Sequence, residues 1–377
     1  MMNRVFSFSP LLTICLCLSS PVFAIIDPVT LPIGSKAPDF DLPGIDGKNY
    51  TLKSFDDAKV LVIAFICNHC PTSQAYEERL IKLTSDYAAR GVKLVAINSN
   101  NPGSLRYDEL GWSDVGDSFE DMKVRAKEKH FNFPYLYDGE KQITANKYGP
   151  VSTPHVFIFD ANRILRYNGR IDDTENPQKT PRSQDARNAI EALLNNEEVP
   201  VSITKVFGCS IKWLDKSDWI NKAAAQWAEA PVTLDIIDVP GTTELLKNNT
   251  DKLRLINIWS VSNHLSTSQF SDIITLSRIY AQRDFELVNI NIDEYKNSNA
   301  VLTFLKKEEA SGSNYILPGA EKNTLITAVD PNWNGKLPYT LLVEPGGKIV
   351  HATQNRINLE EMRKMIFNNP LIGRLYK

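Results

Sequence analysis

The apolar run from Val60 to Ile66 limits the folds open to this chain more than any other stretch. It holds seven consecutive apolar residues, several of them β-branched, which is typical of a strand covered by helices on both faces. Residues 67–70 are Cys-Asn-His-Cys, and Pro71 follows. Because proline is tolerated in a helix only near its start, we expect a helix that begins at or just before Asn68 and carries both cysteines in its first turn.

A cysteine at a helix start has a characteristic chemistry. The unpaired N–H groups and the positive end of the helix dipole both stabilise a thiolate. The sequence therefore predicts a redox pair in which Cys67, with a lowered pKa, attacks and Cys70 resolves the mixed disulfide. His69 adds positive charge when protonated, which favours the thiolate and makes the disulfide more oxidising. The alternatives are a structural disulfide or two core thiols; a four-thiolate zinc site would need a second Cys-x-x-Cys, which the chain lacks.

Residues 1–24 have the pattern of a cleaved secretory signal, with Arg4 ahead of a short apolar run and small residues ending at Ala24. We expect cleavage after Ala24 and an exported product, periplasmic or extracellular, without a transmembrane segment. Three cysteines then remain, Cys67, Cys70 and Cys209, so the mature chain is not a disulfide-stapled scaffold. The formal net charge of −3 does not suggest nucleic acid as a partner.

The order of expected elements indicates the fold class. It comprises two short strands joined by a turn at 46–47, strand 60–66, the helix after the cysteines, strand 92–98, loop 100–117, helix 119–129, strand 133–137, helix 143–148, strands 152–160 and 164–168, and helix 185–194. This alternation predicts an α/β protein of the thioredoxin fold, a central mixed sheet flanked by helices, with extra N-terminal strands.

Several motifs in this part of the chain resemble the peroxiredoxin-like (AhpC/TSA, redoxin) superfamily over about residues 32–195. The opening motif comprises Gly34, Ala37, Pro38, Asp39, Phe40, Leu42, Asp46, Gly47, Leu52 and Phe55. Residues 65–71 are similar to a subgroup that carries a Cys-x-x-Cys pair, and the tail at 208–213 (Gly-Cys-Ser-Ile-Lys-Trp) looks like the same subgroup.

The resemblance implies roles for two further residues. It implies that Pro154 is cis and faces the cysteines, and that the backbone of Thr153 pairs with a substrate chain. The threonine and proline that activate a peroxidatic cysteine are missing ahead of both Cys67 and Cys70, so we expect disulfide exchange more than peroxidase activity. Cys209 is either a third redox thiol or a small buried hydrophobic residue, and the sequence leaves both open.

The last third of the chain repeats the pattern without the cysteines. It has strands at 253–259 and 285–293, a helix over 266–280, a proline-led strand at 337–343, a hairpin into 348–350 and a helix at 359–367. It resembles TlpA/ResA-like thioredoxin domains of cytochrome maturation, with Asn263 and Ser266 where cysteines would stand. We expect a redox domain at 25–199, a connector with Cys209 at 200–232 and a degenerate domain at 233–377.

These inferences predict an exported thiol–disulfide oxidoreductase that acts on protein disulfides or dithiols and needs neither a cofactor nor a metal. The degenerate domain would bind a substrate or redox partner. One alternative is a thiol peroxidase with Cys209 as an extra resolving thiol. The other is a redox-inert or copper-handling protein that binds metal through Cys67, Cys70, His69 and His155.

Overall fold

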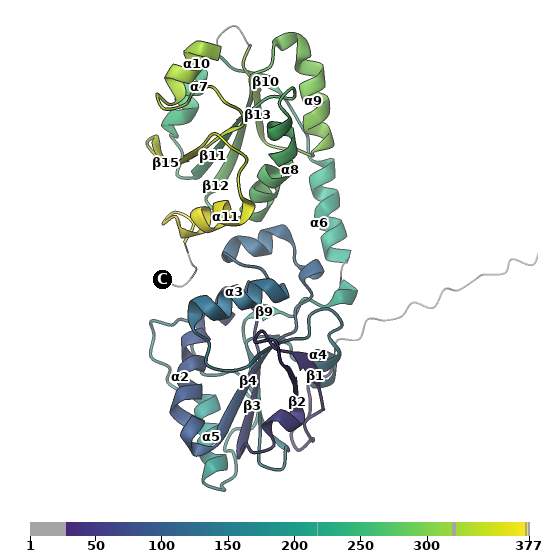
Figure 1. Cartoon of the computed structure of the whole chain (residues 1–377). Helices are drawn as coiled ribbons and strands as arrows, with labels where there is room; N and C mark the ends of the chain where they lie inside the picture. The colour runs from purple at the N-terminus through teal and green to yellow at the C-terminus, as the bar shows by residue number, and fades with distance from the viewer. Residues whose placement is uncertain (1–27, 217, 319–321, 374, 376–377) are drawn as a thin grey trace, which may run out of the picture.

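The computed structural model describes residues 28–373 except 217 and 319–321, together with residue 375 (Figure 1). The secretory signal expected at residues 1–24 lies outside these residues. The described residues form two main β-sheets, stacked one above the other in Figure 1, and helix α6 (Asp218–Glu229) runs alongside them. Among the described residues, no helix is both long and apolar enough to cross a membrane.

The first main sheet has five strands in the order β5-β4-β3-β7-β8. Their bounds are β3 Val60–Phe65, β4 Val92–Asn98, β5 Tyr135–Tyr137, β7 His155–Phe159 and β8 Leu165–Gly169. Strands β3, β4 and β5 are parallel to one another, β7 pairs antiparallel with β3, and β8 pairs antiparallel with β7. All six residues of β3 are buried, which confirms the prediction of a strand covered on both faces.

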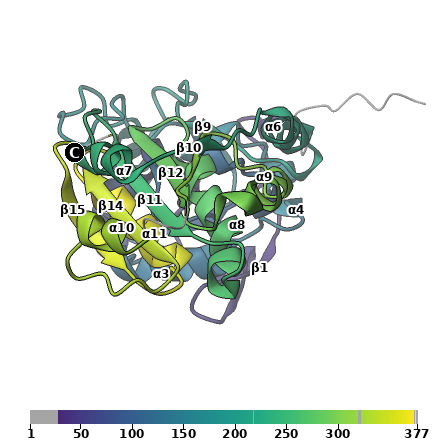
Figure 2. The same cartoon turned by 90° about the horizontal axis from the view of Figure 1, so that it is seen from above.

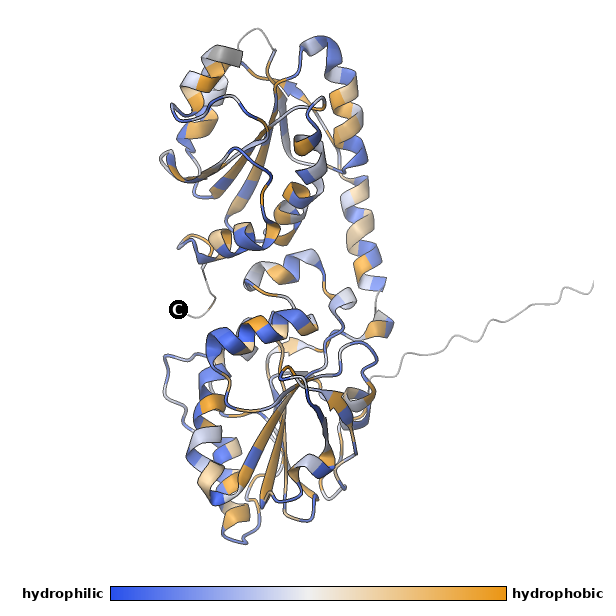
Figure 3. Ribbon diagram, in the orientation of Figure 1, coloured by the Kyte–Doolittle hydropathy of each residue, from blue (hydrophilic) through white to orange (hydrophobic). Residues whose placement is uncertain are grey.

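Alternate residues of β3 enter two separate cores. Val60, Val62 and Ala64 pack with apolar residues of α2 (Glu77–Tyr87), α3 (Phe119–Lys129) and α5 (Asp185–Leu194). Leu61, Ile63 and Phe65 pack on the other face, where the N-terminal hairpin of β1 (Asp41–Pro43) and β2 (Asn49–Thr51), helix α4 (Ile143–Tyr148) and the segment around Trp213 lie. Burial on both faces explains why the strand is a continuous apolar run, and Figure 3 shows its hydrophobic colour.

The second main sheet repeats this architecture with the order β10-β13-β12-β11-β14-β15. The strands are β10 Asp235–Ile236, β11 Leu253–Trp259, β12 Phe285–Asn291, β13 Ser313–Ile316, β14 Tyr339–Glu344 and β15 Lys348–Thr353. The first four strands are parallel to one another, β14 pairs antiparallel with β11, and β15 pairs antiparallel with β14. The prediction of two thioredoxin-like α/β folds in tandem is therefore confirmed.

Helices cover both faces of the second sheet as well. Apolar residues of α8 (His264–Ile279), α9 (Ser298–Lys307) and α11 (Leu359–Asn368) share one core with the sheet. Helices α7 (Val239–Lys247) and α10 (Lys322–Val329) contribute to the core on the opposite face. Figure 2 shows α7 on one side of β11 and β12, with α8 and α9 on the other.

The helix after the cysteines begins later than predicted. It starts at Pro71 and is divided into α1 (Pro71–Ala75) and α2, so the expectation that both cysteines lie in its first turn is wrong. Cys70 is the N-cap, with an extended backbone (φ −77°, ψ 120°). The residue before a proline is disfavoured in the helical conformation, which fixes the boundary here. Helix α8 likewise begins at His264 and not at Ser266, and it is capped by Asn263.

The two halves contact each other at the loop that follows β4. Its short 3-10 helix η4 (Tyr107–Trp112) packs on α8, and a Cβ on Gly111 would lie only 2.3 Å from the carbonyl oxygen of Ile279. The Arg283 guanidinium stacks 4.0 Å over the Trp112 ring and donates to the Gly111 carbonyl. The second half therefore holds the loop that leads to the cysteine site.

Candidate functional site

Cys67 and Cys70 are free thiols at the carboxyl end of β3, and both are closed off from solvent, with exposed fractions of 2% and 0%. The backbone N–H of Cys67 donates to Ser73 Oγ at 3.1 Å, and Cys67 Sγ lies 2.9 Å from Thr153 Oγ1. Burial raises the pKa of the Cys67 thiol. The predicted lowering at Cys67 is therefore wrong, because this residue precedes the helix and has lost the hydration that a thiolate needs.

The lowered pKa belongs to Cys70 instead. Burial acts to raise the pKa of this thiol, but hydrogen bonds from the thiols of Cys209 and Cys67, and the charge of His69, bring it well below the ordinary value. The backbone N–H of Cys209 also donates to Cys70 Sγ at 3.3 Å. The arrangement places a thiolate on Cys70, between two protonated thiols.

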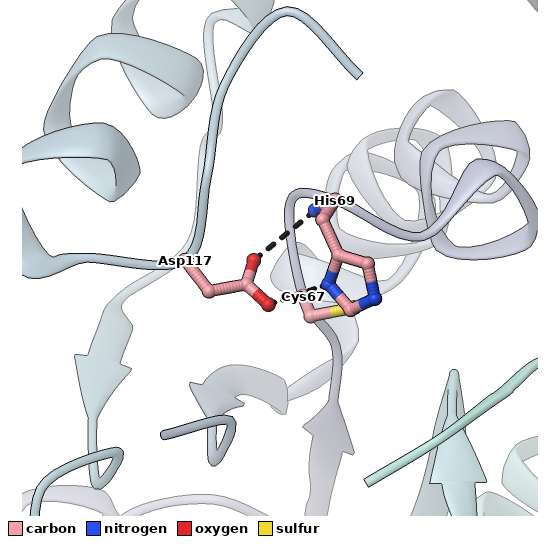
Figure 4. A group of neighbouring side chains, drawn as sticks. All are labelled: Cys67, His69 and Asp117. Atoms are coloured by element: carbon pink, nitrogen blue, oxygen red, sulfur yellow. Dashed lines mark hydrogen bonds and ion pairs between the residues drawn. The ribbon is translucent and has the colours of Figure 1, made fainter. Parts of the chain in front are cut away.

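A buried histidine–carboxylate pair lies beside Cys67 (Figure 4), and Cys70 follows the histidine in the chain. His69 Nδ1 is 2.6 Å from Asp117 Oδ2, and both side chains are almost fully buried. Burial acts to lower the pKa of His69, but the charge and hydrogen bond of Asp117 raise it above its ordinary value. A protonated His69 is therefore favoured next to the Cys70 thiolate, and Asp117 supplies its counter-charge.

Asp117 is held by donors from two segments, residues 68–69 and Asn100. Its Oδ1 accepts the backbone N–H groups of Asn68 (2.7 Å) and His69 (3.1 Å), and its Oδ2 accepts Asn100 Nδ2 at 2.7 Å. Burial acts to raise the pKa of Asp117, yet the charge of His69 and these hydrogen bonds lower it. We did not predict this residue from the sequence. The one available signal is that its loop starts where β4 ends, at the sheet edge where β3 also ends.

The Thr153–Pro154 bond is cis, as the resemblance implied for Pro154, and the Leu337–Pro338 bond is also cis. Cys70 Sγ lies 3.5 Å from the Thr153 carbonyl oxygen, and Thr153 is fully buried. The backbone of Thr153, expected to pair with a substrate chain, is paired in this structure with Cys209. That pairing joins β6 (Ser152–Thr153) to β9 (Cys209–Ser210) in an antiparallel ladder.

The metal ligands envisaged from the sequence do not come together. His155 is buried, its ring stacks on Phe157 at 4.5 Å, and burial lowers its pKa to about 3. Among the described residues, the group with suitable geometry is Cys67, His69 and Asp117, whose ligand atoms lie within 4.8 Å of one another. His155 is not part of that group.

The corresponding place in the second half contains no thiol. Asn263 caps α8 by accepting the N–H of Ser266 at 2.9 Å, so these two residues, predicted to stand in place of cysteines, form a helix cap. Asp293 accepts the backbone N–H of Val261 at 2.7 Å, much as Asp117 does beside the cysteines. An open cavity of about 440 Å³ extends from Asn263 to Leu337, next to the second cis proline.

Comparisons with known proteins address the first half. Residues 33–168 match the AhpC/TSA family. A comparison with curated proteins found no match. A solved hypothetical protein from Sinorhizobium meliloti 1021 is 35% identical over 49% of this chain and 96% of its own, with a TM-score of 0.44. An uncharacterized conserved protein from Geobacillus kaustophilus is 39% identical over 48% of this chain and 92% of its own, with a TM-score of 0.43.

The matched segment, 33–168, contains the Cys-x-x-Cys motif, the cis proline and the five strands of the first main sheet to within one residue. The opening motif and residues 65–71, which suggested the family from sequence alone, lie within it, whereas the tail motif at 208–213 lies outside it. Residues 33–168 of this chain therefore belong to the AhpC/TSA family of thioredoxin-fold proteins.

Proposed function

We propose that the protein is an exported thiol–disulfide oxidoreductase that exchanges electrons with protein disulfides or dithiols through Cys67 and Cys70. The observation that carries the proposal is the position of the Cys-x-x-Cys pair, which lies between the end of β3 and the start of α1, with the Cys209 N–H donating to Cys70 Sγ at 3.3 Å. The groups around Cys70 also lower the pKa of its thiol. A thiolate is the nucleophile of disulfide exchange, and a hydrogen-bonded neighbouring thiol is the group that can close the disulfide. Export rests on the sequence pattern of residues 1–24.

The surrounding groups suit this chemistry. Cys70 attacks one sulfur of the partner disulfide, which breaks the partner S–S bond, forms a mixed disulfide and releases the first partner thiol. Cys67 then loses its proton and attacks Cys70, which forms the Cys67–Cys70 disulfide and releases the second partner thiol. His69 favours the reduced form because its positive charge stabilises the Cys70 thiolate. This assignment exchanges the roles first expected, since the thiol with the lowered pKa is Cys70 and not Cys67.

The proposal is tested by equilibrating the purified protein in glutathione redox buffers and alkylating the free thiols for mass analysis. We expect one two-electron transition that forms the Cys67–Cys70 disulfide and is lost in Cys67→Ser and Cys70→Ser. A potential near about −270 mV would indicate a reductase and one near about −120 mV an oxidase, by comparison with other thioredoxin-fold proteins. A protein that stays fully reduced across all buffers contradicts the proposal.

A second candidate function, metal handling, is favoured by one observation, the grouping of Cys67, His69 and Asp117. Thiolate, imidazole and carboxylate are ligands that zinc and copper accept. Against it, the oxygens of Asp117 already accept hydrogen bonds from Asn68, His69 and Asn100. Stoichiometric copper or zinc after purification, lost in Asp117→Ala, would favour this function.

The thiol peroxidase alternative has its own measurement. Reduced protein would consume hydrogen peroxide, and the consumption would depend on Cys209 if this residue were the resolving thiol.

For the second half we propose partner binding, supported by its kept fold and by the cavity next to Leu337.

A further inference from the structure

The redox pair has no open route to a partner. Cys67 and Cys70 are 2% and 0% exposed, and the two residues between them, Asn68 and His69, are buried as well. Of the three cysteines in the described part of the chain, Cys209 alone is partly exposed. In disulfide exchange, a sulfur of the partner must come into direct contact with a sulfur of the protein. In this structure that approach is open at Cys209.

The strand that carries Cys209 fills the edge beside the redox pair. Cys209 pairs with Thr153 and Ser210 with Ser152, so β9 covers the backbone edge of β6. The backbone N–H of Cys209 donates to Cys70 Sγ at 3.3 Å, which places residue 209 directly against this sulfur. A partner strand cannot pair with Thr153 while β9 is there, whereas Cys209 is already next to Cys70.

Gly208 allows this close approach. A Cβ at position 208 would lie 2.0 Å from the Thr153 carbonyl oxygen and 3.4 Å from Pro154 Cδ. The backbone of Gly208 also has φ +138°, a conformation that residues with a side chain rarely adopt. The chain therefore passes the cis proline at a distance that only glycine permits, and the next residue is the thiol.

The other side of β9 is firmly attached to the first half. Ile211 and Trp213 are buried in the core of its first main sheet. Between them, the N–H of Lys212 donates to Asn100 Oδ1 at 3.0 Å, and its carbonyl accepts the N–H of Asn101 at 3.0 Å. Asn100 also donates to Asp117. Cys209 is thus a built member of the site and not part of a loosely docked tail.

We propose that Cys209 is the external thiol of a three-cysteine relay, in which Cys70 is the central sulfur and Cys67 the terminal one. The relay rests on the proposed function and names the sulfur that meets the partner. In this relay, the thiol that reacts with the partner is Cys209, which lies outside the Cys-x-x-Cys motif.

The exchange steps balance without any further reagent. The neighbouring Cys70 and burial raise the pKa of the Cys209 thiol, so it reacts only after it passes its proton to the Cys70 thiolate. Cys209 then attacks the partner disulfide, which forms a mixed disulfide and releases one partner thiol. Cys70, after losing that proton, attacks the Cys209 sulfur, which forms a Cys70–Cys209 disulfide and releases the second partner thiol. Cys67 loses its proton and attacks the Cys70 sulfur, which forms Cys67–Cys70 and returns Cys209 as a thiol. In sum, the buried pair loses two electrons and the proton of Cys67, and the partner disulfide gains two electrons and two protons. Because Cys70 starts as a thiolate, the remaining proton comes from water.

The test mixes full-length reduced protein with oxidised glutathione, quenches with acid at intervals and locates the disulfides by peptide mass spectrometry. We expect Cys209→Ser to form Cys67–Cys70 roughly tenfold or more slowly than the unaltered protein, because the buried sulfurs must be reached directly. Ser210→Ala, at the exposed neighbouring position, is the matched control and should keep the original rate. Cys67→Ser should stop at a Cys70–Cys209 disulfide, and Cys70→Ser should hold glutathione on Cys209.

The outcomes separate the two proposals. If the unaltered protein forms Cys67–Cys70 and Cys209→Ser does so at the same rate, the relay is wrong and the proposed function stands. Glutathione on Cys67 in Cys70→Ser, with none on Cys209, also overturns the relay. If the unaltered protein forms no Cys67–Cys70 disulfide with oxidised glutathione, the proposed function fails, and the relay fails with it. Far-ultraviolet circular dichroism of each variant checks that it is folded.

Discussion

Replacing Asp117 by asparagine removes the charge that holds His69 protonated and leaves the shape of the side chain nearly unchanged. The Asp117 carboxylate accepts four hydrogen bonds, at 2.6 to 3.1 Å, from Asn68, His69 and Asn100. The asparagine oxygen can still accept the two backbone N–H groups, but its NH2 group faces the donors on Asn100 and His69. Asp117→Asn therefore breaks one side of a buried ion pair.

The magnitude follows from the burial. Removing one partner of a buried pair costs about 3–5 kcal/mol, and because two hydrogen bonds survive we expect the lower end, about 3 kcal/mol. That is a measurable part of a total stability of about 5–15 kcal/mol. Urea unfolding at a series of pH values measures the difference between Asp117→Asn and the unaltered protein.

The pH dependence distinguishes an ion pair from simple packing. The folded pKa of Asp117 lies below its ordinary value of 3.8, so its contribution is present above pH 3.8 and is lost as pH falls through the folded pKa. The folded pKa of His69 lies above 6.5, so its contribution is present below pH 6.5 and is lost as pH rises through the folded pKa. We expect the difference in unfolding free energy to be largest between pH 3.8 and 6.5 and to shrink on both sides.

Asp293→Asn is the matched control. Asp293 also accepts a backbone N–H at the end of a central strand, from Val261, but its other donors are Ser260, Ser262 and Asn291 and include no histidine. We expect no loss of its stabilising effect as pH rises above 6.5. Equal pH profiles for the two variants, or an Asp117→Asn effect that does not change between pH 5 and pH 9, would refute the ion-pair interpretation.

Three further predictions follow from the same contacts. His69→Ala removes a positive charge beside the Cys70 thiolate, so the reduction potential of the Cys67–Cys70 pair should become more negative; an unchanged or more positive value in glutathione buffers contradicts the role of His69. Gly208→Ala places a Cβ against the Thr153 carbonyl and should lower the unfolding free energy by about 1–3 kcal/mol. In the Cys67→Ser background, the same change should slow the formation of a Cys70–Cys209 disulfide. Gly34→Ala, also at positive φ but with open space, is the control, and an equal loss at both glycines would show that contact with Thr153 does not matter. Arg283→Ala removes the contacts that hold the loop ending at Asp117, so the reaction with oxidised glutathione should slow although Arg283 lies in the second half. Lys364→Ala, which removes an exposed ion pair with Glu128, is the control and should have little effect. Equal rates in the two variants would contradict the coupling between the halves.

Local signals in the sequence determined much of the fold. The apolar run at 60–66 predicted the central strand, Ser118 predicted the start of α3, and Gly149 predicted the end of α4. The repeat of strand, helix, strand and proline-led strand predicted the second sheet. Each of these signals acts over a few residues, through burial periodicity, a capping hydrogen bond or a left-handed glycine, so it is visible without the rest of the chain.

The short strand β13 and the edge strand β10 beside it escaped prediction because they contain few residues and carry no periodic pattern long enough to recognise. Helices α7, α9 and α10 were also missed. The helix after the cysteines was predicted to begin too early, since the conformation of Cys70 is set by Pro71 and by the contacts of residues 67–69 with a distant loop.

The electrostatics of the site were decided by tertiary structure. The sequence identified Cys67, His69 and Cys70, and the family resemblance implied that Pro154 is cis, but the lowered pKa was assigned to the wrong thiol. Asp117 and Cys209 come from segments 47 and 139 residues after Cys70, and they reach it through the loop after β4 and through the β6–β9 pairing. Which sulfur bears the charge depends on the donors and charges within a few ångströms in a buried site, and long-range packing, which no local pattern encodes, brings those groups together.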